Sequence, residues 1–339
     1  MALADIARKA EHLINRVGTE RKRKAGWKPQ ATGYFGFGDT SKVRVLGRVL
    51  MEPDHAPQNE AQRGFRQFFT TQVGHEPVVV RAGDREVETR TNDNGYLDIL
   101  IRDHHLTPGW HEVHIDVPAG RPATAEVLIL EPGTEVGLVS DIDDTVMVTM
   151  LPRAMIAAYN SWFLHTDARK PVPGMADFYQ SLRQTYGAEL PVFYLSTGAW
   201  NTFPALVNFM QRFGFPKGPM LLTDWGPTPT GLFRNGQSHK MVQLRNLIID
   251  FPDIKWILVG DDGQHDPLTY GNISSEHPSR VLGVAIRELT PGEHVLAHGT
   301  AAPIEPARRS GVADVPWITG ADGFELQRAL KDAPFPDPN

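Results

Sequence analysis

A series of short apolar segments that alternate with amphipathic ones constrains the fold of this chain most strongly. Each apolar segment is nearly continuous, as in a strand that is buried on both faces. These segments lie at 136–140, 191–196, 219–223, 254–260 and 280–286. Helices are expected at 153–164, 174–186, 200–213, 239–251 and 322–331. The alternation predicts an α/β domain over residues 135–332, a parallel sheet with helices on both faces, followed by a tail at 333–339.

Residues 32–131 show a different pattern, in which strand-like segments recur with turn residues between them. The segments are 42–50, 78–101 with a turn at Asn92-Asp93-Asn94-Gly95, 111–117 and 125–130. Such spacing is typical of a small antiparallel β-sandwich domain. The turn-forming segment Glu131-Pro132-Gly133 marks its boundary with the α/β domain.

The β region also contains a group of histidines. They are His104, His105, His111 and His114. Positions three apart on a strand face opposite sides, so His111 and His114 are not expected to share a metal. We expect solvated or capping roles for the group, and no catalytic chemistry from this domain.

Composition excludes several classes of protein. None of the 339 residues is cysteine, so disulfides, thiolate metal sites and a cysteine nucleophile are excluded. A net charge of −6 does not suit a nucleic-acid-binding protein. We see neither an apolar run long enough for a transmembrane segment nor a signal peptide. We expect a cytoplasmic protein, and the sequence leaves open whether it also associates peripherally with a membrane.

Residues 1–28 are predicted to form a basic amphipathic helix. Its apolar stripe consists of Leu3, Ile6, Ala10, Leu13, Ile14 and Val17. The basic run Arg21-Lys22-Arg23-Lys24 follows. Two interpretations stay open: the helix lies on anionic lipid, or it packs on its own protein and leaves the basic run in solvent.

Polar residues follow the predicted parallel strands at the point where each strand ends. Asp141-Ile142-Asp143-Asp144-Thr145 follows the first strand, and Ser196-Thr197-Gly198 follows the second. Asp261, Asp262 and Asp266 follow the fourth, and Lys240 begins a later helix. The carboxyl ends of parallel strands meet at one edge of a sheet, where ligands bind. We therefore expect these side chains to form one site.

The residue types at this edge suit phosphoryl chemistry with a divalent cation. Crowded carboxylates are stable when a cation neutralises them, and oxygen ligands favour Mg²⁺, with Asp141 and Asp261 as the natural pair. A hydroxyl and an ammonium, from Ser196 and Lys240, can bind an oxyanion. An aspartate can attack phosphorus, and a second carboxylate can transfer the proton. Taken alone, the Asp-x-Asp-x-Thr segment could equally be a solvated turn or a helix cap.

The four segments, in this order, resemble the motifs of the haloacid-dehalogenase superfamily of phosphohydrolases. The matching residues are Asp141, Asp143, Thr145, Ser196, Lys240, Gly260, Asp261, Asp262 and Asp266. More closely, the chain resembles the actin-patch-type, Mg²⁺-dependent phosphatidate phosphatase family. The segments that carry this resemblance are DIDDT, YLSTGAW, SHK, VGDDGQHDP and, in the β region, GFGDTSKVRVLGRVL.

The resemblance implies a haloacid-dehalogenase-like fold and a role for each matched residue. Asp141 would be the nucleophile and Asp143 the general acid and base. The implied Mg²⁺ ligands are Asp141, Asp143 through its backbone carbonyl, and Asp261, with Asp262 or Asp266 assisting. The implied phosphate-binding group is Ser196, Thr197, Gly198, Lys240 and Thr145, of which Thr145 also stabilises the loop. Asp144 receives no role.

The expected function is Mg²⁺-dependent hydrolysis of phosphatidate, or a related phospholipid at a membrane surface, to diacylglycerol and phosphate through an aspartyl-phosphate. One alternative is a phosphatase for soluble phosphate esters or phosphoprotein. Another is a non-catalytic module that binds phosphatidate, against which the intact Asp141 argues.

The spacing of the motifs leaves no room for a large lid domain, so we expect an open site. Between Thr145 and Gly174 there are 28 residues, and between Ser196 and Lys240 there are 43. An open site suits a substrate that is large or embedded in a membrane. An apolar group follows Thr145 and could contact acyl chains or pack on the sheet: Met147, Met150, Leu151, Met155, Ile156, Trp162 and Phe163.

Overall fold

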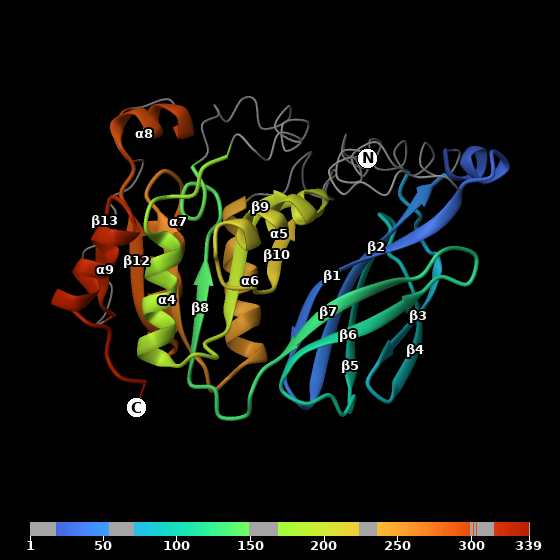
Figure 1. Cartoon of the computed structure of the whole chain (residues 1–339), viewed down its shortest axis with the longest axis horizontal. Helices are drawn as coiled ribbons and strands as arrows, with labels where there is room; N and C mark the ends of the chain where they lie inside the picture. The colour runs from blue at the N-terminus through green and yellow to red at the C-terminus, as the bar shows by residue number, and fades with distance from the viewer. Residues whose placement is uncertain are drawn as a thin grey trace. The chain divides into compact units, whose positions relative to one another are not determined.

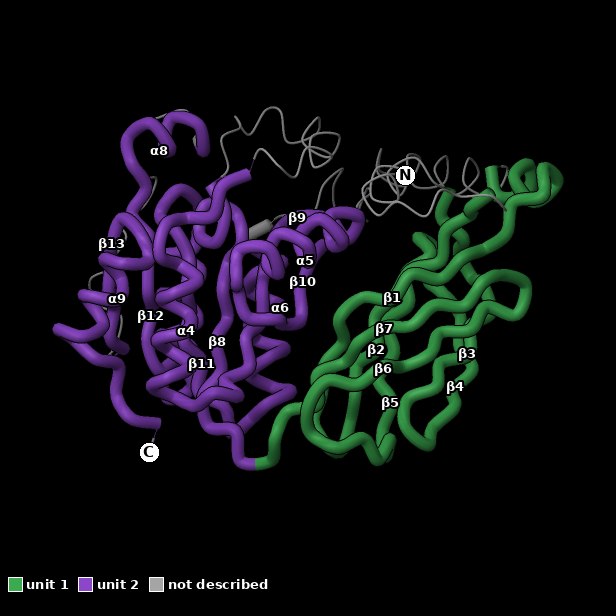
Figure 2. The backbone as a smooth tube through the Cα atoms, in the orientation of Figure 1, with its two compact units in different colours: residues 1–132, 224–234 green, residues 133–223, 235–339 purple. Residues whose placement is uncertain are grey.

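The computed structural model divides into two compact units, one ending at Pro132 and the other beginning at Gly133 (Figure 2). The structure describes residues 18–53, 71–148, 169–223, 236–298, 301, 303 and 315–338. Three predictions lie wholly or partly outside these residues. They are the N-terminal helix up to residue 17, the helix at 153–164, and the two segments between motifs, at residues 149–168 and 224–235. In the described part of the chain, no helix is both long and apolar enough to cross a bilayer.

The first unit is built on one seven-stranded sheet. Its strands are β1 (Lys28–Gly38), β2 (Lys42–Glu52), β3 (Pro77–Ala82), β4 (Arg85–Arg90), β5 (Tyr96–Arg102), β6 (Gly109–Asp116) and β7 (Ala123–Ile129). They lie in the order β4-β3-β6-β7-β1-β2-β5, and every neighbouring pair is antiparallel except β1 and β7. Side chains with no exposed surface, such as Val45, Val80 and Val127, form its core.

The prediction of a two-sheet β-sandwich is wrong. Strand β1 was not expected from the sequence, and it pairs with β2 on one side and β7 on the other. This strand joins the two groups of strands into one continuous sheet. The edge strands β4 and β5 also contact each other, so the sheet curls toward a barrel.

His104 is a structural residue in this unit. Its ring is fully buried, and Nδ1 accepts a hydrogen bond from the N–H of Leu106 at 2.9 Å. The other ring nitrogen, Nε2, therefore carries the proton and donates to the carbonyl of Asp39 at 2.9 Å. His104 has the capping role expected for this group of histidines.

The second unit contains a six-stranded sheet in which all neighbouring strands are parallel. Its strands are β8 (Val136–Ser140), β9 (Val192–Ala199), β10 (Met220–Thr223), β11 (Lys255–Asp261), β12 (Val281–Arg287) and β13 (Trp317–Gly320). Their spatial order is β10-β9-β8-β11-β12-β13. The chain therefore builds outward from β8 in one direction and from β11 in the other. The boundary between β8 and β11 is the switch point at which such sheets bind ligands.

Helices cover both faces of this sheet, as predicted. They are α4 (Met175–Tyr186), α5 (Phe203–Arg212), α6 (Gly236–Asp250), α7 (Asp266–Glu276), α8 (Pro291–His298) and α9 (Gly323–Asp332). Helix α4 contacts α9, and α6 contacts α7. Figure 1 shows α4 in front of the strands and α7 behind them.

Candidate active site

The acidic residues of the second unit meet at the switch point of its sheet. Asp141 directly follows β8, Asp261 is the last residue of the neighbouring β11, and Asp266 begins α7. The N–H of Asp141 donates to the carbonyl of Val259 at 2.9 Å, so the backbone pairing continues one residue beyond β8. Helix α7 directs its N-terminus at the site, and this end of a helix favours a carboxylate such as that of Asp266.

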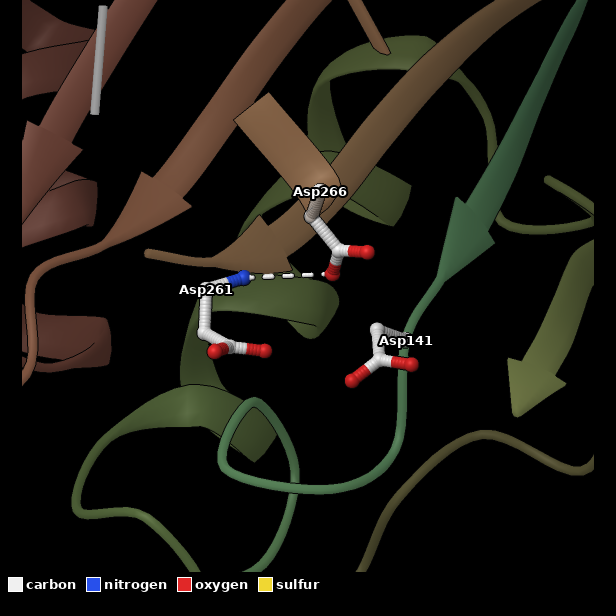
Figure 3. A group of neighbouring side chains, drawn as sticks. All are labelled: Asp141, Asp261 and Asp266. Atoms are coloured by element: carbon white, nitrogen blue, oxygen red, sulfur yellow. Dashed lines mark hydrogen bonds between the residues drawn. The ribbon is translucent and has the colours of Figure 1, made fainter. Parts of the chain in front are cut away.

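Three carboxylates and one ammonium form the centre of the site. Asp141, Asp261 and Asp266 each offer a carboxylate oxygen, and these oxygens lie within 4.8 Å of one another. Figure 3 shows the three side chains facing one another. Lys240, in α6, places Nζ 2.6 Å from Oδ1 of Asp141 and 2.6 Å from Oδ1 of Asp266. When all three carboxylates are ionised, the single positive charge of Lys240 leaves two negative charges in this buried group.

The electrostatics of this group favour a bound divalent cation. Burial raises the pKa of Asp141 and of Asp261, and the neighbouring carboxylates raise both further. Burial opposes the charge of Lys240, but the carboxylates outweigh it and raise the pKa of this ammonium. Oδ2 of Asp141 is buried and has no hydrogen-bond partner among the described residues. A set of oxygen donors carrying two surplus negative charges fits Mg²⁺.

Asp143 and Ser196 are also brought together at this edge. The Ser196 hydroxyl donates to Oδ2 of Asp143 at 3.0 Å and accepts from the N–H of Gly198 at 2.9 Å. Thr197 is exposed, and its carbonyl accepts from the Thr223 hydroxyl at 2.9 Å. The segment after β9 is therefore tied to the Asp143 carboxylate through Ser196.

Thr145 lies within the site, whereas Asp262 lies outside the group of three carboxylates. The Thr145 hydroxyl donates to Oδ2 of Asp261 at 3.3 Å, which connects the two acidic loops. Oδ1 of Asp262 accepts from the N–H of Leu289 at 2.8 Å and lies 3.5 Å from Nε2 of His294. These contacts engage Asp262 with the segment after β12.

Asp144, which the sequence left without a role, is a turn residue. Its φ of 59° is left-handed, and its carbonyl accepts from Nη1 of Arg287 at 2.7 Å. Sequence reasoning missed Arg287 and His294. Arg287 directly follows the predicted strand 280–286, so the rule that identified Asp141 and Asp261 as strand-end residues would also have found it.

Gly260 allows Asp266 to approach the site closely. A Cβ atom at this position would lie 2.5 Å from Oδ2 of Asp266 and 2.7 Å from the ring of Tyr270. Gly260→Ala is therefore expected to lower the free energy of unfolding by about 1–3 kcal/mol, measured by urea denaturation. Gly292→Ala is the control, because a Cβ there meets nothing within 4 Å. Equal stability of the two variants would contradict the close packing of Asp266.

The fold and the site define an α/β domain with a buried group of three carboxylates and one lysine, which could hold a cation, at the switch point of a parallel sheet. Residues 136–288 match the family model described as the catalytic domain of phosphatidate phosphatase APP1. The expected resemblance to the actin-patch-type phosphatidate phosphatase family is thereby confirmed for the domain that contains the site.

Two curated relatives are similar to this chain, and one of them is named a phosphatidate phosphatase. Phosphatidate phosphatase APP1 of Saccharomyces cerevisiae is 30% identical over 234 residues, which are 65% of this chain and 39% of the relative. An uncharacterized protein of Schizosaccharomyces pombe is 23% identical over 155 residues, which are 45% of this chain and 25% of that protein. The chain thus spans well under half the length of both relatives. Among solved structures, a carbohydrate acetylesterase from Xanthomonas citri aligns with 89% of this chain and 75% of its own at 10% identity, but its TM-score of 0.29 carries no argument.

Proposed function

We propose that this protein is a Mg²⁺-dependent phosphatidate phosphatase that acts through an aspartyl-phosphate on Asp141. The observation that carries the proposal is the buried group of three carboxylates and one ammonium, in which Oδ2 of Asp141 has no partner among the described residues. The choice of substrate rests on the relative from Saccharomyces cerevisiae, which is named a phosphatidate phosphatase. We assign the second unit to the haloacid-dehalogenase-like fold on the order of its four motifs.

In this proposal, Asp141, Asp261 and Asp266 would hold Mg²⁺. The backbone carbonyl of Asp143 would be a further ligand. When bound, such a cation would neutralise the surplus charge of the carboxylates and would withdraw electrons from the phosphate group. Asp262, which is engaged with Leu289, acts at a distance from the cation by fixing the acidic loop.

Lys240 distinguishes the two oxygens of the nucleophile. It binds Oδ1 of Asp141 at 2.6 Å. We propose that Oδ1 is also the oxygen that the cation would share, and that Oδ2, which has no partner among the described residues, is the attacking atom. Oδ2 forms a bond to phosphorus, the ester bond breaks, and the departing diacylglycerol oxygen takes a proton from Asp143. The phosphoryl oxygens are proposed to contact Lys240 and the segment Ser196-Thr197-Gly198.

The second half of the reaction regenerates Asp141. The Asp143 carboxylate takes a proton from water, and the water oxygen attacks phosphorus. The bond between phosphorus and Asp141 then breaks, which releases phosphate. The hydrogen bond from Ser196 to Oδ2 of Asp143, at 3.0 Å, orients this carboxyl group. Geometry therefore supports the separation of roles, with Asp141 as nucleophile and Asp143 as proton carrier.

Purified protein is expected to release phosphate from phosphatidate in vesicles, to lose that activity in EDTA and to regain it with excess Mg²⁺. Phosphate release is measured beside a panel of soluble phosphate esters and a phosphoprotein. Release from the soluble substrates only would replace the lipid proposal with the first alternative. Vesicle binding without release would favour a phosphatidate-binding module. A lipid substrate implies action at a membrane surface, which we propose is cytoplasmic and reached by peripheral contact.

A further inference from the structure

Arg287 lies at the same edge of the sheet as the three carboxylates, and it contacts three separate segments. It is the last residue of β12 and is 5% exposed. Nε donates to the carbonyl of Ala321 at 3.0 Å, Nη1 to the carbonyl of Asp144 at 2.7 Å, and Nη2 to Oε1 of Glu293 at 2.6 Å. A guanidinium presents its donors in a rigid plane, so these three acceptors are held in one geometry.

The contact with Asp144 fixes the loop that carries Asp141 and Asp143. Asp144 has φ 59°, a left-handed conformation that residues other than glycine adopt rarely. Its N–H donates to the carbonyl of Met147 at 2.8 Å, and its own carbonyl accepts from Arg287. The charge of the guanidinium strengthens the second of these bonds. Arg287 therefore stabilises an unfavourable turn directly beside the proposed proton carrier.

The backbone of Arg287 fixes the second acidic loop. The N–H of Asp262 donates to the carbonyl of Arg287 at 3.0 Å, and β11 pairs with β12 as far as Asp261 and Arg287. Two residues further on, the N–H of Leu289 donates to Oδ1 of Asp262 at 2.8 Å. A single residue thus contacts the loop after β8 through its side chain and the loop after β11 through its main chain.

Glu293, the third acceptor, is itself held by the start of α8. The N–H and the hydroxyl of Thr290 both donate to Oε2 of Glu293 at 2.9 Å, and the N–H of Glu293 donates back to the hydroxyl at 3.3 Å. This reciprocal arrangement is a capping box. Because Thr290 engages Oε2, the other oxygen faces Arg287, and the start of the helix sets the orientation of the arginine.

We infer that Arg287 is a positioning residue that holds the Asp141 loop and the Asp261 loop at the separation a single divalent cation requires. It contacts both loops and leaves the reacting atoms to Asp141 and Asp143. The inference rests on the proposed function, but it concerns the alignment of two loops and not the chemical step.

Arg287→Lys tests this role, because lysine keeps the charge and offers one compact ammonium in place of a planar fork. We expect the dissociation constant for Mn²⁺, measured by electron paramagnetic resonance without substrate, to rise about 10–100-fold. The kcat for phosphate release should fall by a similar factor, while the KM for phosphatidate vesicles stays within about twofold. Arg245→Lys is the matched control: this exposed arginine also bonds to a glutamate, Glu276, with two hydrogen bonds of 3.0 and 2.8 Å. Its Mn²⁺ affinity should equal that of the wild type.

Wild-type Mn²⁺ affinity and kcat in Arg287→Lys would overturn the inference. If that variant does not fold, Glu293→Gln provides the same test, because it keeps an oxygen for Thr290 and removes the charge that faces Arg287. We expect a smaller rise of the Mn²⁺ dissociation constant, and no rise would overturn the inference. Metal binding requires neither phosphatidate nor turnover. A wild-type protein that binds Mn²⁺ more tightly than Arg287→Lys but releases no phosphate would therefore contradict the proposed function alone.

Discussion

Asp141→Asn is expected to lower the rate of phosphate release by ~10⁴-fold or more, because it removes the nucleophile of the proposed reaction. The fold should survive, since the substitution deletes one of three carboxylates that compete for a single ammonium. Lys240 keeps its 2.6 Å contact with Asp266. In EDTA, the melting temperature of the variant should equal or exceed that of the wild type. Phosphate release and thermal unfolding are measured on the same preparations.

The control for this prediction is Asp98→Asn, which makes the same chemical change on β5. The Asp98 side chain is 50% exposed and lies 2.7 Å from Arg44. The rate of phosphate release by Asp98→Asn should match that of the wild type. Mass spectrometry of the acid-quenched wild-type protein during turnover should find the phosphoryl group on the peptide that contains Asp141. Substantial activity in Asp141→Asn, or a phosphoryl group on another residue, would rule out the aspartyl-phosphate mechanism.

Much of the parallel sheet could be predicted because burial on both faces leaves a continuous apolar run in the sequence. Strand β8 occupies the predicted residues 136–140, and β11 and β12 are each displaced by one residue. Helix α7 was missed because buried residues surround it, so it has no amphipathic stripe. Strand β13 has only four residues, too few to establish a pattern.

The convergence of Asp141, Asp261 and Lys240 could also be predicted, since it follows from the rule that parallel strands end at one edge. The direction of a side chain within a loop could not. Asp262 is adjacent to Asp261 but turns to Leu289, because the loop backbone places the two carboxylates differently. Likewise, the left-handed conformation of Asp144 depends on partners that are remote in sequence, among them Arg287.

The same dependence on tertiary contacts explains the error in the first unit. Strand β1 carries glycines at positions where a Cβ would meet the backbone of a neighbouring strand, for instance 2.2 Å from the Thr124 carbonyl at Gly33. Glycine is depleted in β-strands, so the sequence of segment 28–38 does not predict a strand. Only the close approach of β2 and β7 shows why these residues lack side chains.

Lys240→Met is expected to lower the free energy of unfolding by about 3–5 kcal/mol in EDTA, because it leaves a buried group of carboxylates without its positive charge. The side chain of Lys240 is only 5% exposed and bridges Asp141 and Asp266. Saturating Mg²⁺ should restore part of the loss, since a ligand that binds the native state stabilises it. Phosphate release should remain low, because the ammonium also contacts the nucleophile. Urea denaturation with EDTA or with Mg²⁺ measures the stability.

Lys331→Met, in the exposed last turn of α9, is the control for the loss of a lysine. In EDTA its stability should match that of the wild type, and Mg²⁺ should stabilise it as much as it stabilises the wild type. Comparing the stabilities of Lys240→Met and Lys331→Met tests whether the three carboxylates carry more negative charge than Lys240 balances. If Lys240→Met costs less than about 1 kcal/mol in EDTA, the carboxylates must take up protons in place of the ammonium. The group would then be neutral without a metal, and the two surplus charges that argue for Mg²⁺ would not exist. A large loss that Mg²⁺ partly reverses is the result expected if Lys240 balances buried negative charge that a cation can also balance.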